Sequence, residues 1–247
     1  MLSHAERIDA ARSAIGYITG RTADELEQPV PNCPGWTVYN AAAHIGRVGI
    51  AWEEMITSPP EDPQSRERGY ARSAERPAGA TTTELASWVE AAIDHLVDDT
   101  ERRCYFSMTG GEGTAELWAW HAASELGIHR LDVEAALGHD HSMTDEQALD
   151  AATYTCHYFL PAMRRVIGRD PGRITARLLG ADTTLAGRVT VESETLEGVT
   201  IEGPAVQVLL ALWGRPHHGV EAIGGDPEVL AGWRALPGEA FQFGTWD

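Results

Sequence analysis

The chain has 247 residues, of which 43% are hydrophobic, and a formal net charge of −18. This length allows one large domain or two modest ones, each with a buried core. The negative charge is spread along the chain and argues against nucleic-acid binding, because phosphate contacts need clustered cations. The chain has 19 arginines and no lysine. The lack of lysine excludes Schiff-base chemistry and a Walker lysine.

From its composition we expect the sequence to contain neither a membrane span nor a secretion signal. No apolar stretch approaches the roughly 18 residues that a spanning helix needs, and the first residues are polar. The cysteines, Cys33, Cys104 and Cys156, are odd in number and widely spaced, which suits a reducing compartment. We therefore expect a cytoplasmic protein that binds no membrane and no nucleic acid.

Hydrophobic periodicity and capping patterns predict an antiparallel helical bundle over residues 1–168. Helices are expected at residues 3–20, 37–56, 82–102, 114–137 and 145–166. Ser3 and Glu6 form a capping box at the start of the first helix, and Pro161 can kink the last one. Residues 57–80 carry four prolines and little apolar periodicity. This composition predicts a long surface loop.

The pattern changes after Gly168. Three β-branched, alternating segments separated by glycines, at residues 173–179, 187–192 and 198–202, predict three strands of one antiparallel sheet. Pro204 and Asp226 then open two helices, the second of which ends near Leu236. The predicted class is α+β, with a bundle at 1–168 and a small α/β domain with a short antiparallel sheet at 169–247.

Glu125 and His129 are the first candidates for chemistry. They lie four residues apart in a mostly apolar helix, so both side chains project from one face, about one turn apart. A buried carboxylate is costly unless it is paired or bound to a metal. His44, on the helix after Cys33-Pro-Gly-Trp36, could supply a third ligand, and so could His121, four residues before Glu125. Two histidines and one glutamate form a catalytic zinc set with an open fourth position.

Other polar residues near these positions have two interpretations each. Asp132 could orient the His129 ring, as carboxylates around metal sites do, or pair with Arg130 or Arg103 at the surface. Arg215, between a glycine and a proline, could bind a carboxylate in bidentate fashion or cap a helix C-terminus. Cys33 has no basic activator beside it and is interpreted as structural.

Three segments in this order resemble the mycothiol-dependent maleylpyruvate isomerase family. They are Val30-Pro-Asn-Cys-Pro-Gly-Trp-Thr-Val38 followed by His44, then Glu125-Leu-Gly-Ile-His-Arg-Leu-Asp-Val-Glu134, and finally Leu212-Trp-Gly-Arg215 after Ile201-Glu-Gly-Pro-Ala205. The resemblance implies a DinB-like four-helix bundle at the amino-terminal end. It implies His44, Glu125 and His129 as the metal ligands, with His121 as a neighbour, and Arg215 as a substrate-binding residue. A further arginine of the isomerases could correspond to Arg72 or Arg76.

The resemblance also implies that zinc, or another divalent metal, binds the thiolate of a small cofactor, mycothiol in this family. Metal coordination deprotonates a thiol whose pKa is otherwise near 8.5. Reversible addition of this thiolate to an activated double bond gives cis–trans isomerisation, whereas attack on an electrophile without release gives S-transfer. We favour the S-transferase at this point because the family is broad.

Two other functions are compatible with the same residues. The first is a metal-dependent hydrolase in which the metal activates a water molecule. The second is a non-catalytic binding protein whose bundle keeps the metal for stability. Catalytic activity that does not depend on a thiol would indicate the hydrolase. A metal that raises the melting temperature, without any thiol-dependent reaction, would indicate the binding protein.

Overall fold

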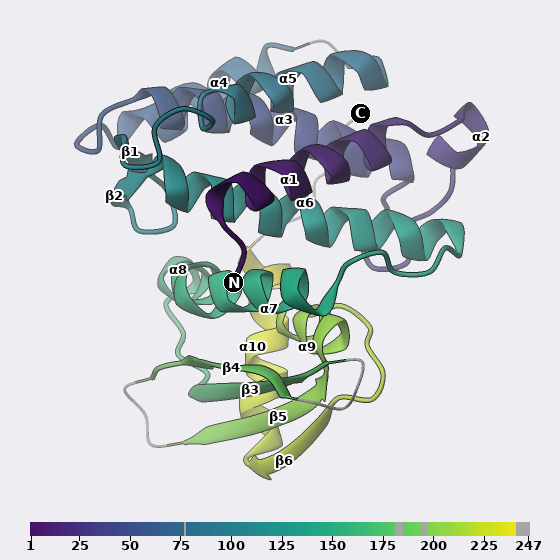
Figure 1. Cartoon of the computed structure of the whole chain (residues 1–247), viewed down its shortest axis with the longest axis vertical. Coiled ribbons are helices and arrows are strands. Elements are labelled where there is room, and N and C mark those ends of the chain that lie inside the picture. Colours follow the sequence, from purple (N-terminus) through teal and green to yellow (C-terminus); the bar gives the residue numbers. More distant parts are fainter. Residues whose placement is uncertain (77, 181–184, 194–196, 241–247) are drawn as a thin grey trace. The chain divides into compact units, whose positions relative to one another are not determined.

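The computed structural model describes residues 1–76, 78–180, 185–193 and 197–240 (Figure 1). Helices and β-sheet are both present, so the predicted α+β class is confirmed. Within the described residues, every helix is too short or too polar to cross a lipid bilayer. The chain divides into two compact units, Ser3–Ser142 and residues 143–240 with Met1 and Leu2, which we call the first and the second unit.

The division between the units lies earlier than the predicted boundary at residues 168 and 169. The helices that follow Ser142 belong to the unit that contains the larger sheet. Leu149 packs so closely on Gly187 of that sheet that a Cβ added there would lie 2.3 Å from Leu149 Cδ1. The indole N–H of Trp213 donates to Thr155 Oγ1 at 2.8 Å. These helices are held by the second unit because their buried side chains pack there.

The first unit contains long helices and one hairpin. Its elements are α1 (His4–Thr19), α2 (Ala23–Leu26), α3 (Val38–Thr57), α4 (Gln64–Ala74), α5 (Thr82–Asp94), β1 (Arg103–Phe106), β2 (Gly111–Thr114) and α6 (Ala115–Leu137). In Figure 1, α3 lies beside α4 and α5, and α1 lies along α6, in agreement with the contacts between these helices. The predicted bounds of α1, α3 and α6 are confirmed to within a residue or two, and so is the capping box at Ser3.

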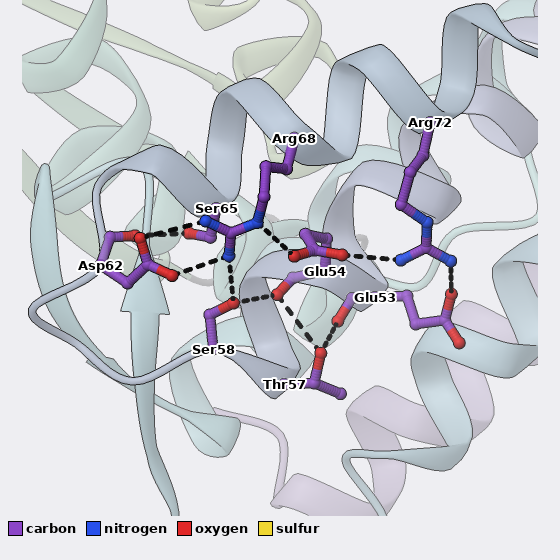
Figure 2. Close-up of polar contacts among 8 residues, drawn as sticks. All are labelled: Glu53, Glu54, Thr57, Ser58, Asp62, Ser65, Arg68 and Arg72. Carbon is purple, nitrogen blue, oxygen red and sulfur yellow. Dashed lines mark hydrogen bonds and ion pairs between the residues drawn. The ribbon is translucent and has the colours of Figure 1, made fainter.

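The predicted surface loop at residues 57–80 is wrong, because it contains the helix α4. This helix has no apolar stripe and is held to α3 by ion pairs instead (Figure 2). Arg68 donates to Glu54 at 2.9 Å and to Asp62 at 2.7 Å. Arg72 donates to Glu54 at 2.8 Å and to Glu53 at 3.0 Å. Periodicity of apolar residues could not reveal a helix that is stabilised through charges.

The predicted helix at residues 82–102 is too long, because α5 ends at Asp94 and the hairpin of β1 and β2 follows. Phe106 covers Gly113 so closely that a Cβ at Gly113 would lie 2.2 Å from Phe106 Cβ. The indole N–H of Trp118 donates to the carbonyl of Tyr105 at 2.9 Å. These contacts hold the two strands of the hairpin together and attach the hairpin to α6.

The second unit combines helices with a four-stranded sheet. Its elements are α7 (Asp145–Tyr154), the π-helical turn η1 (Thr155–Phe159), α8 (Leu160–Ile167), β3 (Arg173–Leu179), β4 (Leu185–Val191), β5 (Gly198–Pro204), α9 (Ala205–Leu212), β6 (Glu221–Gly225) and α10 (Pro227–Ala240). The predicted helix at 145–166 is therefore interrupted. Leu160 donates its N–H to Thr155 five residues back, directly before Pro161, which has no N–H to donate.

The prediction of a three-stranded antiparallel sheet is wrong in two respects. The sheet has four described strands in the order β4-β3-β5-β6, and β5 runs parallel to β3, with Ala176 opposite Ile201. The chain crosses from β4 to the other side of β3, and β6 then adds to β5 in antiparallel fashion. Both α9 and α10 contact the central strands, so that side chains such as Leu178 are fully buried.

Close contact between α3 and α4 depends on Gly69. A Cβ there would lie 2.8 Å from Ala51 Cα and 2.9 Å from Ala51 O. Exposed ion pairs such as those of Arg68 and Arg72 contribute only about 0–1 kcal/mol each. The steric fit at Gly69 therefore limits how closely α4 approaches the helix that carries His44.

We expect Gly69→Ala to lower the free energy of unfolding by about 1–3 kcal/mol, because the added methyl group meets backbone that cannot move freely. Gly16→Ala in α1 is the matched control, since a Cβ there has no atom within 4 Å. Its expected effect is between zero and a gain of about 1 kcal/mol. Urea unfolding of both variants measures the difference, and equal stabilities would show that α4 does not depend on this contact.

Candidate metal centre

His44 is positioned by the turn that precedes α3. The turn is closed by the Trp36 N–H, which donates to the Cys33 carbonyl at 2.9 Å, and Gly35 adopts φ +86°, a conformation that favours glycine. Thr37 then caps α3, where its side chain accepts from the N–H of Asn40. This cap fixes the start of the helix and places His44 two turns into it.

Glu125 and His129 lie on consecutive turns of α6 and meet His44 from α3. Glu125 Oε1 lies 3.5 Å from His129 Nε2 and 3.6 Å from His44 Nε2. One ligand atom from each of the three residues lies within 4.8 Å of the others. The His129 side chain is 4% exposed, and those of Glu125 and His44 are 14% and 15% exposed. The helices thus bring together the three residues that the sequence indicated.

These three side chains fit a zinc ion or a similar divalent metal. Zinc bonds to imidazole nitrogen and carboxylate oxygen at about 2.0–2.2 Å in tetrahedral geometry, which separates ligand atoms by about 3.3–3.6 Å. The two distances from Glu125 Oε1 fall at this separation. Two imidazoles and one carboxylate also leave a fourth position for an exogenous ligand.

The charges in the site are coupled. Burial raises the pKa of Glu125, but hydrogen bonds with His129 and His44 outweigh burial and lower the pKa well below its usual value. Burial lowers the pKa of His129, but hydrogen bonds with Asp132 and Glu125 outweigh it and raise the pKa to about 9. A carboxylate that stays ionised under cover of protein is suited to binding a cation.

Asp132 contacts the other nitrogen of the His129 ring. Its Oδ2 lies 3.2 Å from His129 Nδ1, and the Cys33 thiol donates to the same oxygen at 3.5 Å. Of the two interpretations of Asp132, the structure therefore supports orientation of His129, since Arg130 pairs with Glu134 instead. Cys33, His129 Nδ1 and Asp132 also lie close enough to be considered as ligands, but they share His129 with the first group.

Trp36 covers the histidines. Its ring stacks on His129 with centroids 5.9 Å apart and lies 5.1 Å from the His44 ring. The sequence pattern indicates Cys33 and Trp36 only as parts of the turn before His44. The contact between Cys33 and Asp132 spans 99 residues, and no local pattern could have predicted it.

His121 lies outside the group of ligand atoms found among the described residues. Its ring packs against Trp52, Trp118 and Phe106 at centroid distances of 5.0, 5.4 and 6.1 Å. Burial lowers the pKa of His121 to about 4, so its ring is neutral at physiological pH. The sequence alone left His121 and His44 as alternatives, and the geometry favours His44.

Each arginine candidate is described by its contacts within its own unit. Arg215 belongs to the second unit, where it is 6% exposed and its N–H donates to the Leu210 carbonyl at 2.9 Å. Arg72 is bonded to the glutamates of α3, and the Arg76 guanidinium lies 5.4 Å from the Trp88 ring centroid. The contacts given for Arg72 and Arg76 do not include His44, Glu125 or His129.

A family model described as the mycothiol maleylpyruvate isomerase N-terminal domain matches residues 9–134, which include His44, Glu125 and His129. The chain belongs to this family. Two solved structures have a similar fold, a crystal structure of the mycothiol-dependent maleylpyruvate isomerase and one of a histidine-to-alanine mutant. Each has 16% sequence identity to this chain, and the aligned part spans 91% of this chain and 95% of the solved one. The TM-scores are 0.57 and 0.58. At this identity the likeness establishes the fold alone, and no curated protein matches the chain.

We expect His129→Ala to abolish stoichiometric zinc binding, because it removes one of three ligands from a site that binds about one ion. His121→Gln is the matched control on the same face of α6 and should keep the ion. Metal content after zinc loading and gel filtration measures both, with circular dichroism as the check of folding. Zinc retained by folded His129→Ala protein, or lost from folded His121→Gln protein, would contradict the assignment.

Proposed function

We propose that the protein is a metal-dependent enzyme that uses a small thiol, mycothiol or a close analogue, to act on a small electrophile. The observation that carries this proposal is the convergence of His44, Glu125 and His129 in a chain of this family. Three protein ligands of this kind leave a fourth position on a bound zinc ion for an exogenous ligand. We assign the helices α1, α3, α5 and α6 to the DinB-like four-helix bundle of that family. Zinc is the proposed metal, although nitrogen and oxygen ligands also bind iron, cobalt or nickel.

A metal at this site would supply a deprotonated thiol at neutral pH. The chain itself supplies the setting for this thiol. Asp132 holds the His129 ring so that Nε2 points to Glu125, because Nδ1 faces the Asp132 carboxylate. Trp36 covers the two imidazoles and keeps water from that side. The side chains therefore fix orientation and polarity before any substrate binds.

Arg215 is the proposed binding residue for a carboxylate of the substrate. A guanidinium donates two parallel hydrogen bonds to a carboxylate, and burial strengthens such a pair. Arg215 is 6% exposed and follows Gly214, which adopts φ +70°, so its backbone is held in a tight turn. A buried arginine in the Trp-Gly-Arg turn favours a substrate with an acid group. We therefore place cis–trans isomerisation of an unsaturated keto acid ahead of S-transfer to a neutral electrophile.

The test is turnover by the zinc-loaded protein with and without mycothiol. We expect isomerisation of maleylpyruvate only when mycothiol is present, and loss of at least about 100-fold in kcat/KM for His44→Ala, because its metal ligand is gone. Conjugation of monobromobimane without isomerisation would instead indicate an S-transferase. Turnover that needs no thiol, or full activity of His44→Ala, would contradict the proposal.

A further inference from the structure

A cavity in the second unit lies between β4 and the helical segment that runs from α7 through η1 to α8. Its volume is about 660 Å³, which falls in the range of roughly 300–1,000 Å³ that small-molecule sites occupy. One wall contains residues spaced about one helical turn apart, Thr153, His157, Pro161 and Arg164, and the other contains residues 187–190 of β4. All the lining residues belong to the second unit, so this unit defines the cavity by itself.

The backbone on both sides of the cavity is unusual. The π-helical turn η1 contributes Cys156 and His157 to the lining, and such turns are rare and occur frequently at functional sites. On the other side, β4 is the outer strand of the described sheet and pairs with β3 (Figure 1). Four consecutive residues of β4 line the cavity, although alternate side chains point to opposite faces, so the cavity borders the edge of the strand. Backbone N–H and C=O groups along this edge are available to a ligand.

Arg164 connects the two walls of the cavity. Its Nη1 group donates to Asp170 Oδ2 at 3.1 Å and to the Glu192 carbonyl at 3.2 Å, which links α8 to the residue after β4. The remaining donors of the guanidinium, on Nε and Nη2, make no hydrogen bond with a described residue. Because the group is already held in place, a ligand that it binds would cost little additional side-chain entropy.

Arg188 brings a second positive charge to the lining. It lies directly opposite Arg177 in the register of β3 and β4, and like charges in such a pair are destabilising. Arg177 is compensated by Glu202 at 2.9 Å, whereas Arg188 forms no ion pair with a described residue. Glu192 is the one acidic residue among the described residues that line the cavity. An anionic ligand would therefore compensate the charge of Arg188 through a charge-assisted hydrogen bond.

The remaining lining is largely apolar. Leu149, Cys156, Pro161 and Val189 all contribute to it, and burial raises the pKa of the Cys156 thiol to about 12, so the thiol stays neutral. The Thr153 hydroxyl donates to the Leu149 carbonyl at 2.7 Å and so its proton is already used. These groups suit the hydrocarbon part of a ligand, because apolar surface is removed from water on both sides.

We propose that this cavity binds a small organic anion, with its carboxylate or phosphate group at Arg164 and Arg188 and its hydrocarbon part against the apolar lining. The site goes beyond the proposed function, since it requires neither the metal nor the thiol. It gives the second unit a ligand of its own.

Binding can be measured by NMR of the full-length, zinc-loaded protein with labelled histidines and no thiol. The protein should carry no extension before Met1, because Met1 also lines the cavity. Phenylacetate and phenyl phosphate are the anionic probes, phenylacetamide is the neutral counterpart, and inorganic phosphate lacks the hydrocarbon part. We expect an anionic aromatic probe to shift the His157 signal in a saturable manner. Phenylacetamide and inorganic phosphate should bind at least about tenfold more weakly.

The tighter of the two anionic aromatic probes identifies the preferred acid group. Absence of a saturable shift with both would overturn the proposal. So would equally tight binding of phenylacetamide, which would show that charge has no role, or of inorganic phosphate, which would show that the apolar lining has none.

Variants locate the bound probe in the cavity. We expect Arg188→Gln to weaken binding of the preferred probe about tenfold, because a charge-assisted hydrogen bond is lost. Thr153→Phe, which fills the cavity without a change in charge, should abolish binding. Arg165→Gln is the matched control, since it removes an exposed cation of α8 that does not line the cavity. Unchanged affinity in folded Arg188→Gln or folded Thr153→Phe protein, or an equal loss in Arg165→Gln, would overturn the inference.

Discussion

The structure of the first unit depends on the largely buried carboxylate of Glu125, which lies between the imidazoles of His44 and His129. Removing Glu125 from water without compensation would cost several kcal/mol, so two helices must present nitrogen atoms to it at the correct distance. His44 on α3 and His129 on α6 do so at 3.6 and 3.5 Å. The same arrangement that satisfies the carboxylate also brings one potential ligand atom from each of the three side chains within 4.8 Å of the others. Stability and binding of a cation are therefore linked in one cluster.

The surrounding elements keep these helices in place. The turn before α3 sets its first residue, α4 lies along α3 through Gly69 and the charged residues of Figure 2, and α6 begins at a capped residue after the hairpin. Around the ligands, Cys33, Asp132 and His129 form a chain of contacts that ends at the ring nitrogen facing away from Glu125. Such outer contacts set the tautomer and orientation of a ligand and tune its affinity for a metal.

The sequence predicted the parts of the molecule that local rules govern, and it missed those that depend on distant partners. The helices α1, α3 and α6 have capping residues and buried apolar side chains, and their bounds were predicted closely. The helix α4 has neither, and it contacts α3 through Gly69 and through ion pairs with glutamates on α3. The parallel pairing of β3 and β5 places residues 25 apart in register, which no short pattern specifies. The grouping of His44, Glu125 and His129 was predictable from spacing and resemblance, whereas the contact between Cys33 and Asp132 required three-dimensional coordinates.

The central claim is that His44, Glu125 and His129 hold a metal whose remaining position binds a small thiol. X-ray absorption spectroscopy at the zinc edge of the loaded protein, before and after addition of mycothiol, tests it most directly. The account predicts only nitrogen and oxygen neighbours at first and a new sulfur neighbour at about 2.3 Å after the thiol is added. A first coordination shell that is unchanged by the thiol, or one that contains sulfur from Cys33 beforehand, would contradict it.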